Sequence, residues 1–257
     1  MSGVHPQAAV GFGRAADVYE RGRAGFPAEV VDAILRESEA GEGRTLLELG
    51  AGTGKLTRAL TGHGARVIAL EPVAGMRAVL TVRAPEAEPL DAVAEAIPLA
   101  DASVDAVIAA QAYHWFDPVT ATAEVARVLR PGGLVALVWN RRDESAAWMR
   151  ELTALIDAHA GDAPRYRNGE WRRGFDGNTA FTPFEERSWP HRGEQGRAVV
   201  LERVASISFV AAMDDEPRAH LLAEVSELLE NHPEIRGRSD VAIPYVTELF
   251  TARRREG

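Results

Sequence analysis

Short apolar segments alternate with helical segments over the first 140 residues, and this pattern constrains the fold of the 257-residue chain most strongly. The apolar segments span residues 45–49, 65–70, about 87–93, 104–110 and 134–139, and helical segments fall at 55–61, 74–83 and 119–129. Because the strand segments are apolar on both faces, both faces must be covered. The order predicts an α/β fold with a mostly parallel, doubly wound sheet between two layers of helices.

The last third of the chain is less regular. Its spacing predicts helices at 145–160, 197–206 and 216–230, and strands at 184–190 and 243–251. The stretch 162–179 is rich in Arg, Gly and Asn and is predicted to be a mobile loop. We expect residues 141–257 to complete the same sheet and to cap it within a single domain, 1–257. A separate small domain is the alternative.

Composition excludes several classes of chemistry. The chain has no cysteine, which excludes disulfides, thiolate nucleophiles and Cys-ligated metals, and no His/Glu pattern suggests another metal site. A net charge of -9 argues against non-specific binding to nucleic acid or to an anionic membrane. No segment resembles a signal peptide or a membrane span, so the expected location is the cytoplasm.

A glycine-rich turn follows the first strand, at Gly50-Ala51-Gly52-Thr53-Gly54. A Walker loop would need glycine at Leu49 and Ser or Thr at Leu56, and a dinucleotide fingerprint would need its third glycine at Lys55. Both readings are therefore disfavoured, while a purely structural tight turn remains open. A G-x-G-x-G turn after Glu48 lets a ligand lie directly on the main chain, at the N–H groups of the next helix.

Glu71 ends the second strand, 17 residues after Gly54. The carboxyl ends of neighbouring parallel strands meet at the ligand-binding edge of such a sheet. A carboxylate there can accept hydrogen bonds from both ribose hydroxyls and would repel a 2′-phosphate. The alternative is a solvated charge at a strand end.

Four motifs in this order resemble a known family. They read LLELGAGTGKLTRAL, VIALEP, AEAIPLADASVDAVIAAQAYHWFD and EVARVLRPGGLVALVWN, between Thr45 and Asn140. They are similar to class I S-adenosylmethionine-dependent methyltransferases of type 11. The lead-in FGRAADVYERGRAGFP, residues 12–27, resembles the small-molecule branch that includes trans-aconitate methyltransferase-like proteins.

The resemblance implies a Rossmann-like seven-stranded sheet whose last strand is antiparallel, with a helical cap. It implies N-terminal lid helices within 1–40, a cofactor-binding core at 41–140, and sheet completion with a substrate cap at 141–257. It further implies S-adenosylmethionine as cofactor, a small-molecule acceptor, no nucleic-acid or membrane partner, and a monomer or homodimer.

The family's cofactor residues map onto this chain position by position. Those implied to bind S-adenosylmethionine are Tyr19, Arg23, Glu48, Gly50, Ala51, Gly52, Gly54, Glu71, Pro72, Met76, Ala94, Glu95 and Gln111. Met76 is equally well explained as a core residue. The family often places Asp before Ala94, where this chain has Val93, so either Asp91 or the backbone would contact the adenine amino group.

The loop after the fourth strand carries the candidates for catalysis, His114 and Tyr113. His114 is the best candidate for a general base, because its ordinary pKa is near 6.5, and a substrate-orienting or structural role is the alternative. Aromatic faces attract the sulfonium cation of the donor. Trp115, Trp139 and Asn140 are the candidates for the acceptor pocket, although Trp115 is as easily a core residue.

Arginines near this region are the remaining site candidates. The chain has 28 Arg and one Lys, so chance clustering explains most groups of them. Even so, an acidic acceptor would benefit from those expected to overhang the pocket, which are Arg141, Arg142, Arg165, Arg167, Arg172 and Arg173. The rival functions are a non-catalytic S-adenosylmethionine-binding protein and a nicotinamide-dependent oxidoreductase.

Overall fold

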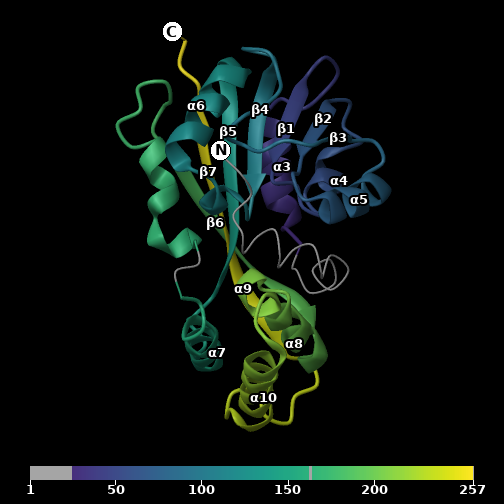
Figure 1. Cartoon of the computed structure of the whole chain (residues 1–257), viewed down its shortest axis with the longest axis vertical. Helices are drawn as coiled ribbons and strands as arrows, with labels where there is room; N and C mark the ends of the chain where they lie inside the picture. Colours follow the sequence, from purple (N-terminus) through teal and green to yellow (C-terminus); the bar gives the residue numbers. More distant parts are fainter. Residues whose placement is uncertain (1–24, 162–163, 257) are drawn as a thin grey trace.

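The computed structural model describes residues 25–161 and 164–256. Its seven strands form one sheet in the order β3-β2-β1-β4-β5-β7-β6 (Figure 1). The strands are β1 (Thr45–Leu49), β2 (Arg66–Leu70), β3 (Glu88–Leu90), β4 (Val104–Ala110), β5 (Leu129–Arg142), β6 (Glu185–Gln195) and β7 (Ala242–Arg253). Strand β7 runs antiparallel to both β5 and β6, and the other pairs are parallel. The predicted fold class, including its antiparallel last strand, is confirmed.

Helices cover both faces of the sheet, because alternate strand residues face opposite sides. On one face Leu46, Val67 and Ile108 pack with α3 (Ala28–Glu37), α4 (Thr57–Leu60) and α5 (Ala74–Arg83). On the other face Leu47 and Val107 pack with α6 (Pro118–Val128) and the 3₁₀ helix η3 (Glu170–Gly174). The sheet is therefore buried on both sides, as the uniformly apolar strand segments predict.

Helix α6 shows how local sequence sets an element boundary. The side chain of Asp117 accepts a hydrogen bond from the backbone N–H of Thr120 at 2.8 Å, which caps the first turn. Pro118 occupies the start of the helix, where its missing N–H costs nothing. The boundary places the loop 111–117 at the carboxyl end of β4.

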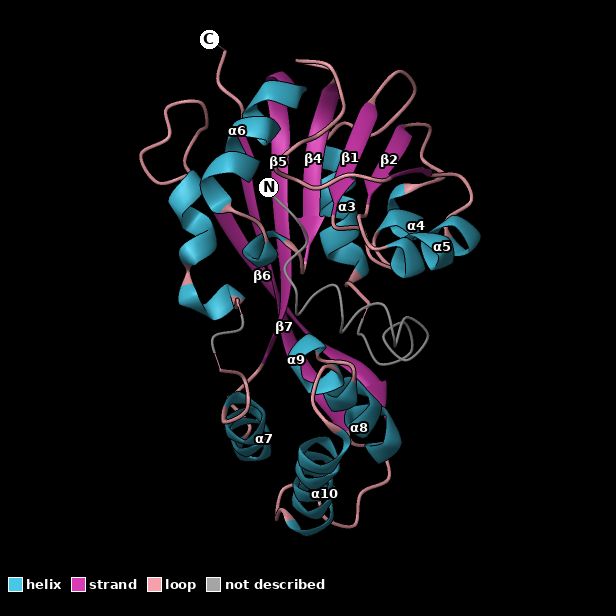
Figure 2. Cartoon of the chain, viewed as in Figure 1, coloured by secondary structure: helices cyan, strands magenta, loops and turns pink. Residues whose placement is uncertain are grey.

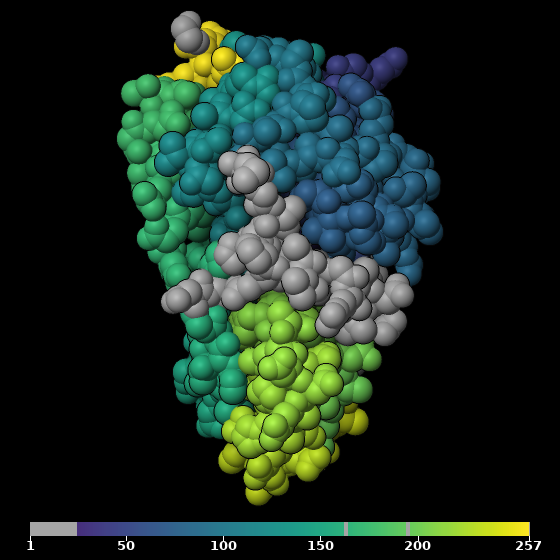
Figure 3. Space-filling view, in the orientation of Figure 1, coloured from purple at the N-terminus to yellow at the C-terminus, as the bar shows by residue number. Residues whose placement is uncertain are grey.

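A second layer of structure extends beyond the carboxyl ends of the parallel strands (Figures 1 and 2). It contains α7 (Ala147–Asp157), α8 (Arg197–Ala205), α9 (Ser208–Ala211) and α10 (Asp215–Asn231). These helices share a hydrophobic cluster of their own with Ile243 and Tyr245 of β7. We call this layer the cap. In the space-filling view it forms the narrower end of the molecule (Figure 3).

Several elements differ from the expected bounds, and the differences at β5 and at 162–179 have a clear structural reason. Strand β5 runs from residue 129 to 142 instead of 134 to 139, because Leu129 pairs with Val104 before a register shift and Arg142 still pairs with Tyr245. The stretch 162–179, expected to be a loop, contains two 3₁₀ helices, η2 (Tyr166–Asn168) and η3. Trp171 of η3 is buried against the sheet, which anchors this segment.

Candidate functional site

The glycine turn lies between β1 and α4 and is held by Glu71 at the end of β2. Its three glycines, Gly50, Gly52 and Gly54, have φ angles of 63°, 59° and 84°, the left-handed region that favours glycine. One carboxylate oxygen of Glu71 accepts the backbone N–H of Gly52 at 2.9 Å, and the other accepts that of Val73 at 2.8 Å. The lone pairs of Glu71 that these bonds do not use can accept from a ligand.

Gly50 and Gly52 need to be glycine for different reasons. A Cβ on Gly50 would lie 2.7 Å from the Cβ of Ala112, so the turn packs directly against the loop after β4. A Cβ on Gly52 would meet nothing within 4 Å. Gly52 therefore presents bare main chain to open space, as a ligand cradle requires.

Glu48 lies beneath the turn and is only 2% exposed. The hydroxyl of Thr57 donates to its carboxylate at 2.6 Å. Burial raises the pKa of Glu48 to about 8, and the nearby charge of Glu71 adds to the rise. A ligand cation placed beside Glu48 would stabilise its ionised form.

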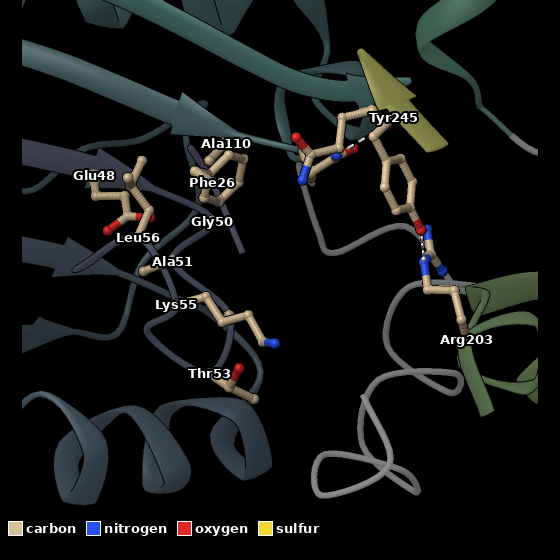
Figure 4. A pocket seen from close by; sticks show the side chains of 13 residues that line it. Phe26, Glu48, Gly50, Ala51, Thr53, Lys55, Leu56, Ala110, Arg203 and Tyr245 are labelled. Carbon is tan, nitrogen blue, oxygen red and sulfur yellow. Dashed lines mark hydrogen bonds between the residues drawn. The ribbon is translucent and has the colours of Figure 1, made fainter. Parts of the chain in front are cut away.

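A cavity of about 510 Å³ opens over this turn (Figure 4). In the view, Lys55 and Thr53 lie on one side and Arg203 and Tyr245 on the other. The described residues around it are Phe26, Glu48, Gly50, Ala51, Gly52, Thr53, Lys55, Leu56, Ala110, Gln111, Asn140, Arg203 and Tyr245. We call it the glycine-loop cavity.

Gln111, directly after β4, has a φ of 57°, which is uncommon for a residue other than glycine. Its backbone N–H donates to the carbonyl of Val138 at 2.8 Å, and its side-chain Nε2 donates to the carbonyl of Asn140 at 3.2 Å. Both bonds tie it to β5. Such outliers concentrate at functional sites, where the surrounding structure holds them in place.

A second cavity of about 930 Å³ begins where the first one ends. The two share Gln111, Asn140, Arg203 and Tyr245. The second is lined further by the cap and by the loop after β4, through His114, Trp115, Arg141, Arg142, Ile156, Asp157, Pro164, Arg165, Tyr166, Arg167, Ile207, Ser208 and Phe209. We call it the cap cavity.

The two candidate catalytic residues are neighbours in the 3₁₀ turn η1 (Tyr113–Trp115), but they lie in different surroundings. His114 lines the cap cavity, and its Nδ1 accepts a hydrogen bond from the indole Nε1–H of Trp139 at 3.2 Å. Tyr113 is fully buried, and its hydroxyl is 2.7 Å from that of Thr122. Burial raises the pKa of Tyr113. Its place in the core gives Tyr113 no contact with either cavity, so we leave it out of the proposed chemistry.

The acceptor candidates are divided in the same way. Trp115 and Asn140 line the cap cavity. Trp139 is 1% exposed and instead stacks on Tyr166, with ring centroids 4.6 Å apart, and touches Trp171. It therefore reaches the cavity only through other residues, by its bond to His114 and its stacking on Tyr166.

The cofactor candidates outside the turn are more scattered. Met76 and Ala94 are buried, Pro72 is half-buried, and none of the three lines the two cavities. The carboxylate of Glu95 accepts the backbone N–H of Asp117 at 2.8 Å. Two further candidates, Tyr19 and Arg23, lie outside the described residues.

The adenine contact expected of Asp91 meets a competing interaction. The carboxylate of Asp91 forms an ion pair with Arg77 at 2.7 Å, and Arg77 also donates to the main-chain carbonyl of Glu71. The side chain of Asp91 is 67% exposed. Asp91 therefore supports the end of β2 through Arg77.

Several residues that line the cavities were not anticipated from the sequence, and Arg203 of α8 and Tyr245 of β7 are the two of them that line both. The guanidinium Nε of Arg203 donates to the hydroxyl of Tyr245 at 3.1 Å, and Figure 4 shows the pair facing the glycine turn. Arg203 lies in an unremarkable helical segment, so no local signal distinguishes it from the other arginines. Of the arginines expected to overhang the pocket, Arg172 and Arg173 do not line the cap cavity.

A family model for a methyltransferase domain matches residues 47–137. An uncharacterized methyltransferase of Mycobacterium tuberculosis (strain ATCC 25618 / H37Rv) is 40% identical over 241 residues, covering 94% of each chain. The chain belongs to the methyltransferase family. An uncharacterized methyltransferase-like protein of Schizosaccharomyces pombe (strain 972 / ATCC 24843) is 32% identical over 92% of each chain. The predicted resemblance to class I S-adenosylmethionine-dependent methyltransferases is confirmed, while the trans-aconitate branch stays a prediction.

Solved structures agree with the fold of this methyltransferase. The YcgJ protein from Bacillus subtilis matches with a TM-score of 0.61 and 20% identity, covering 90% of this chain and 100% of that one. Geranyl diphosphate methyltransferase, in complex with GPP and sinefungin, matches with a TM-score of 0.52 and 18% identity, covering 88% and 78%. At these identities the likeness shows the fold alone. In the described residues, no helix is long and apolar enough to span a membrane.

Proposed function

We propose that this methyltransferase uses S-adenosylmethionine, bound in the glycine-loop cavity, to methylate a small molecule bound in the cap cavity. The observation that carries the proposal is that the two cavities adjoin each other and have four lining residues in common. Gln111, Asn140, Arg203 and Tyr245 line both. A donor in the first cavity and an acceptor in the second would meet at these shared residues.

The residues of the glycine-loop cavity fit the chemistry of the cofactor. The bare main chain at Gly52 suits a ligand that lies on the backbone, and buried Glu48 suits a ligand ammonium group. Glu71 does not line this cavity, but its carboxylate is fixed beside the turn by the backbone N–H groups of Gly52 and Val73, a position that suits a ribose. The fold relative geranyl diphosphate methyltransferase was solved with sinefungin, and we extend that type of ligand to this chain as part of the proposal.

When bound, the cofactor supplies an electrophilic methyl group on a sulfonium. The protein's own residues then have to orient the acceptor and exclude water, which are the main sources of acceleration for a direct displacement. Gln111 and Asn140 would set the position of the acceptor, because they are tied to each other at the junction. The cap helices would enclose it.

The proposal is tested by thermal shift with S-adenosylhomocysteine and with NAD, followed by turnover on a panel of metabolites. A ligand at 100 times its dissociation constant should add about 2.7 kcal/mol to the free energy of unfolding. We expect S-adenosylhomocysteine to stabilise the protein and NAD to leave it unchanged. Stabilisation by NAD alone would refute the proposal. Cofactor binding without any methylated product would favour the non-catalytic alternative.

A further inference from the structure

The cap cavity gathers positive charge in a chain whose net charge is -9. Five of its lining residues are arginines, namely Arg141, Arg142, Arg165, Arg167 and Arg203. Among the described residues, three carboxylates pair with them, those of Glu144, Asp157 and Glu248. Within residues 25–161 and 164–256, five guanidinium groups therefore meet three carboxylates, an excess of two positive charges.

The excess is located at two of the arginines. Asp157 pairs with Arg165 at 3.1 Å and with Arg167 at 3.2 Å, and it lies 3.7 Å from Arg142. The contact of Arg142 with Asp157 is therefore the longest of the three, and the same carboxylate already pairs with two closer arginines. In the described part of the chain, no carboxylate lies within 4.0 Å of Arg203.

The fold holds these two arginines in fixed positions around Tyr245. Arg142 of β5 is directly opposite Tyr245 of β7 in the sheet, and its Nε donates to the hydroxyl of Thr153 at 2.9 Å. Arg203 reaches the same tyrosine from α8, with 3.1 Å between its Nε and the Tyr245 hydroxyl (Figure 4). Each Nε is thus anchored, and both arginines line the cavity.

The electrostatic cost of this arrangement is visible at Arg142. Its side chain is 20% exposed, and burial lowers its pKa to about 10, with the charge of Arg203 adding to the effect. Arg142 therefore still carries a positive charge at neutral pH, as arginine side chains in proteins do. Two partly buried cations that repel each other would be stabilised by an anion between them.

We infer that Arg142 and Arg203 form an anion subsite in the cap cavity and that the methyl acceptor carries a carboxylate or phosphate group bound there. This inference rests on the proposed function, because it names the acceptor class for the same cavity. Guanidinium groups with anchored Nε atoms match the planar oxygens of a carboxylate and those of a phosphate. Arg142 lines only the cap cavity, which places the subsite on the side away from the glycine turn.

The test is calorimetric titration of the full chain at low ionic strength, with and without saturating S-adenosylhomocysteine. The probes are succinate, citrate and glycerol phosphate, with neutral succinamide as the uncharged counterpart of succinate. We expect at least one anion to bind and succinamide not to bind. The carboxylates and the phosphate ester are separate arms, so the stronger one identifies the acceptor group.

Variants locate the subsite. Arg142→Gln and Arg203→Gln should each weaken binding of the anion by about tenfold or more, because each removes a charge-assisted hydrogen bond. Arg142→Gln should not change the affinity for S-adenosylhomocysteine, because Arg142 does not line the glycine-loop cavity. Arg203→Lys keeps the charge but loses the two parallel N–H donors of the guanidinium group. Its affinity for the anion should therefore fall between those of the wild type and Arg203→Gln. Arg238→Gln is the matched control, because Arg238 pairs with Asp240 outside the cavity and should change nothing. Thermal melting of each variant confirms that it folds.

Four outcomes would overturn the inference. The first three are equal binding of succinamide and succinate, no binding of any anion at millimolar concentration, and unchanged anion binding in both variants. If Arg203→Gln weakens S-adenosylhomocysteine but not the anion, Arg203 serves the cofactor carboxylate instead and the subsite is refuted. Because anions are also titrated without S-adenosylhomocysteine, failure of cofactor binding can be distinguished from failure of the subsite.

Discussion

The indole of Trp139 donates a hydrogen bond to Nδ1 of His114, with 3.2 Å between the two nitrogens. A neutral histidine that accepts at Nδ1 carries its proton on Nε2. Protonation of Nδ1 would break the bond and leave a buried indole N–H without its acceptor. The arrangement therefore favours an orienting role for His114 over the role of general base.

We expect His114→Gln to lower kcat by less than about tenfold, because orientation is lost while no proton transfer is removed. The measurement is the pH profile of kcat for the wild type and the variant, once an acceptor is known. Trp139→Phe is the companion variant, since it removes only the donor to Nδ1. A loss of about 10²-fold or more in His114→Gln, together with the disappearance of a limb from the profile, would restore the role of base.

Gly52→Ala should separate ligand binding from stability. Both this change and Gly43→Ala put a Cβ at a positive φ, 59° and 79°, with nothing within 4 Å of the new atom. Each should therefore cost about 1–2 kcal/mol of unfolding free energy. Of these two glycines, only Gly52 lines the glycine-loop cavity. We therefore expect only Gly52→Ala to weaken the binding of S-adenosylhomocysteine, by about tenfold or more. Equal affinity in the two variants would show that the ligand does not lie on Gly52.

Glu48 should give stability a specific dependence on pH. Its folded-state pKa, about 8, is raised above the ordinary value of 4.5, so the folded protein holds a proton that the unfolded chain releases. The penalty for ionising Glu48 is absent below pH 4.5, grows as the pH rises, and is complete above about pH 8. Glu48→Gln should match the wild type near pH 4.5 and exceed its stability by a few kcal/mol at pH 8. Urea denaturation of the ligand-free protein across this range measures it. A difference that does not change with pH would mean that Glu48 ionises freely.

Gln111→Gly should raise the free energy of unfolding and lower the catalytic rate. Glycine relieves the positive φ of 57° and should add about 1 kcal/mol to the unfolding free energy. Loss of the side chain that bonds to Asn140 should lower kcat by about tenfold. Ala102→Gly is the control, because Ala102 has a φ of 48° in an exposed turn and lies outside both cavities. The control should gain stability and keep its activity. Unchanged activity in Gln111→Gly would remove Gln111 from the site.

The sequence was sufficient where the evidence is local. The glycine turn and the acid at the end of β2 are read from short contiguous patterns, and the structure joins them through the bond from Gly52 to Glu71. Arg203 could not be found in this way, because it meets the site only through its bond to Tyr245, 42 residues further along the chain. That meeting depends on how α8 packs in the cap, which no local pattern records.

Neighbouring residues show the same limit at a finer scale. Tyr113 and His114 are adjacent, yet the 3₁₀ turn directs the first to the core and the second to the cavity. A single turn has too few residues for a periodicity to show. Trp139 and Asn140 were both expected in the pocket, but successive strand residues face opposite sides, so one lies in the core and the other at the junction.

Strands β5 and β7 continue from the sheet into the cap in one unbroken register, and Arg142 and Tyr245 lie on their extended part. Arg142 is held by hydrogen-bonded strands, so if the proposed anion subsite is correct, its distance from the glycine turn is fixed and the acceptor would be selected by length as well as by charge. Exchange of the cap helices between relatives would then change what is methylated, while the reach to the methyl group would stay the same.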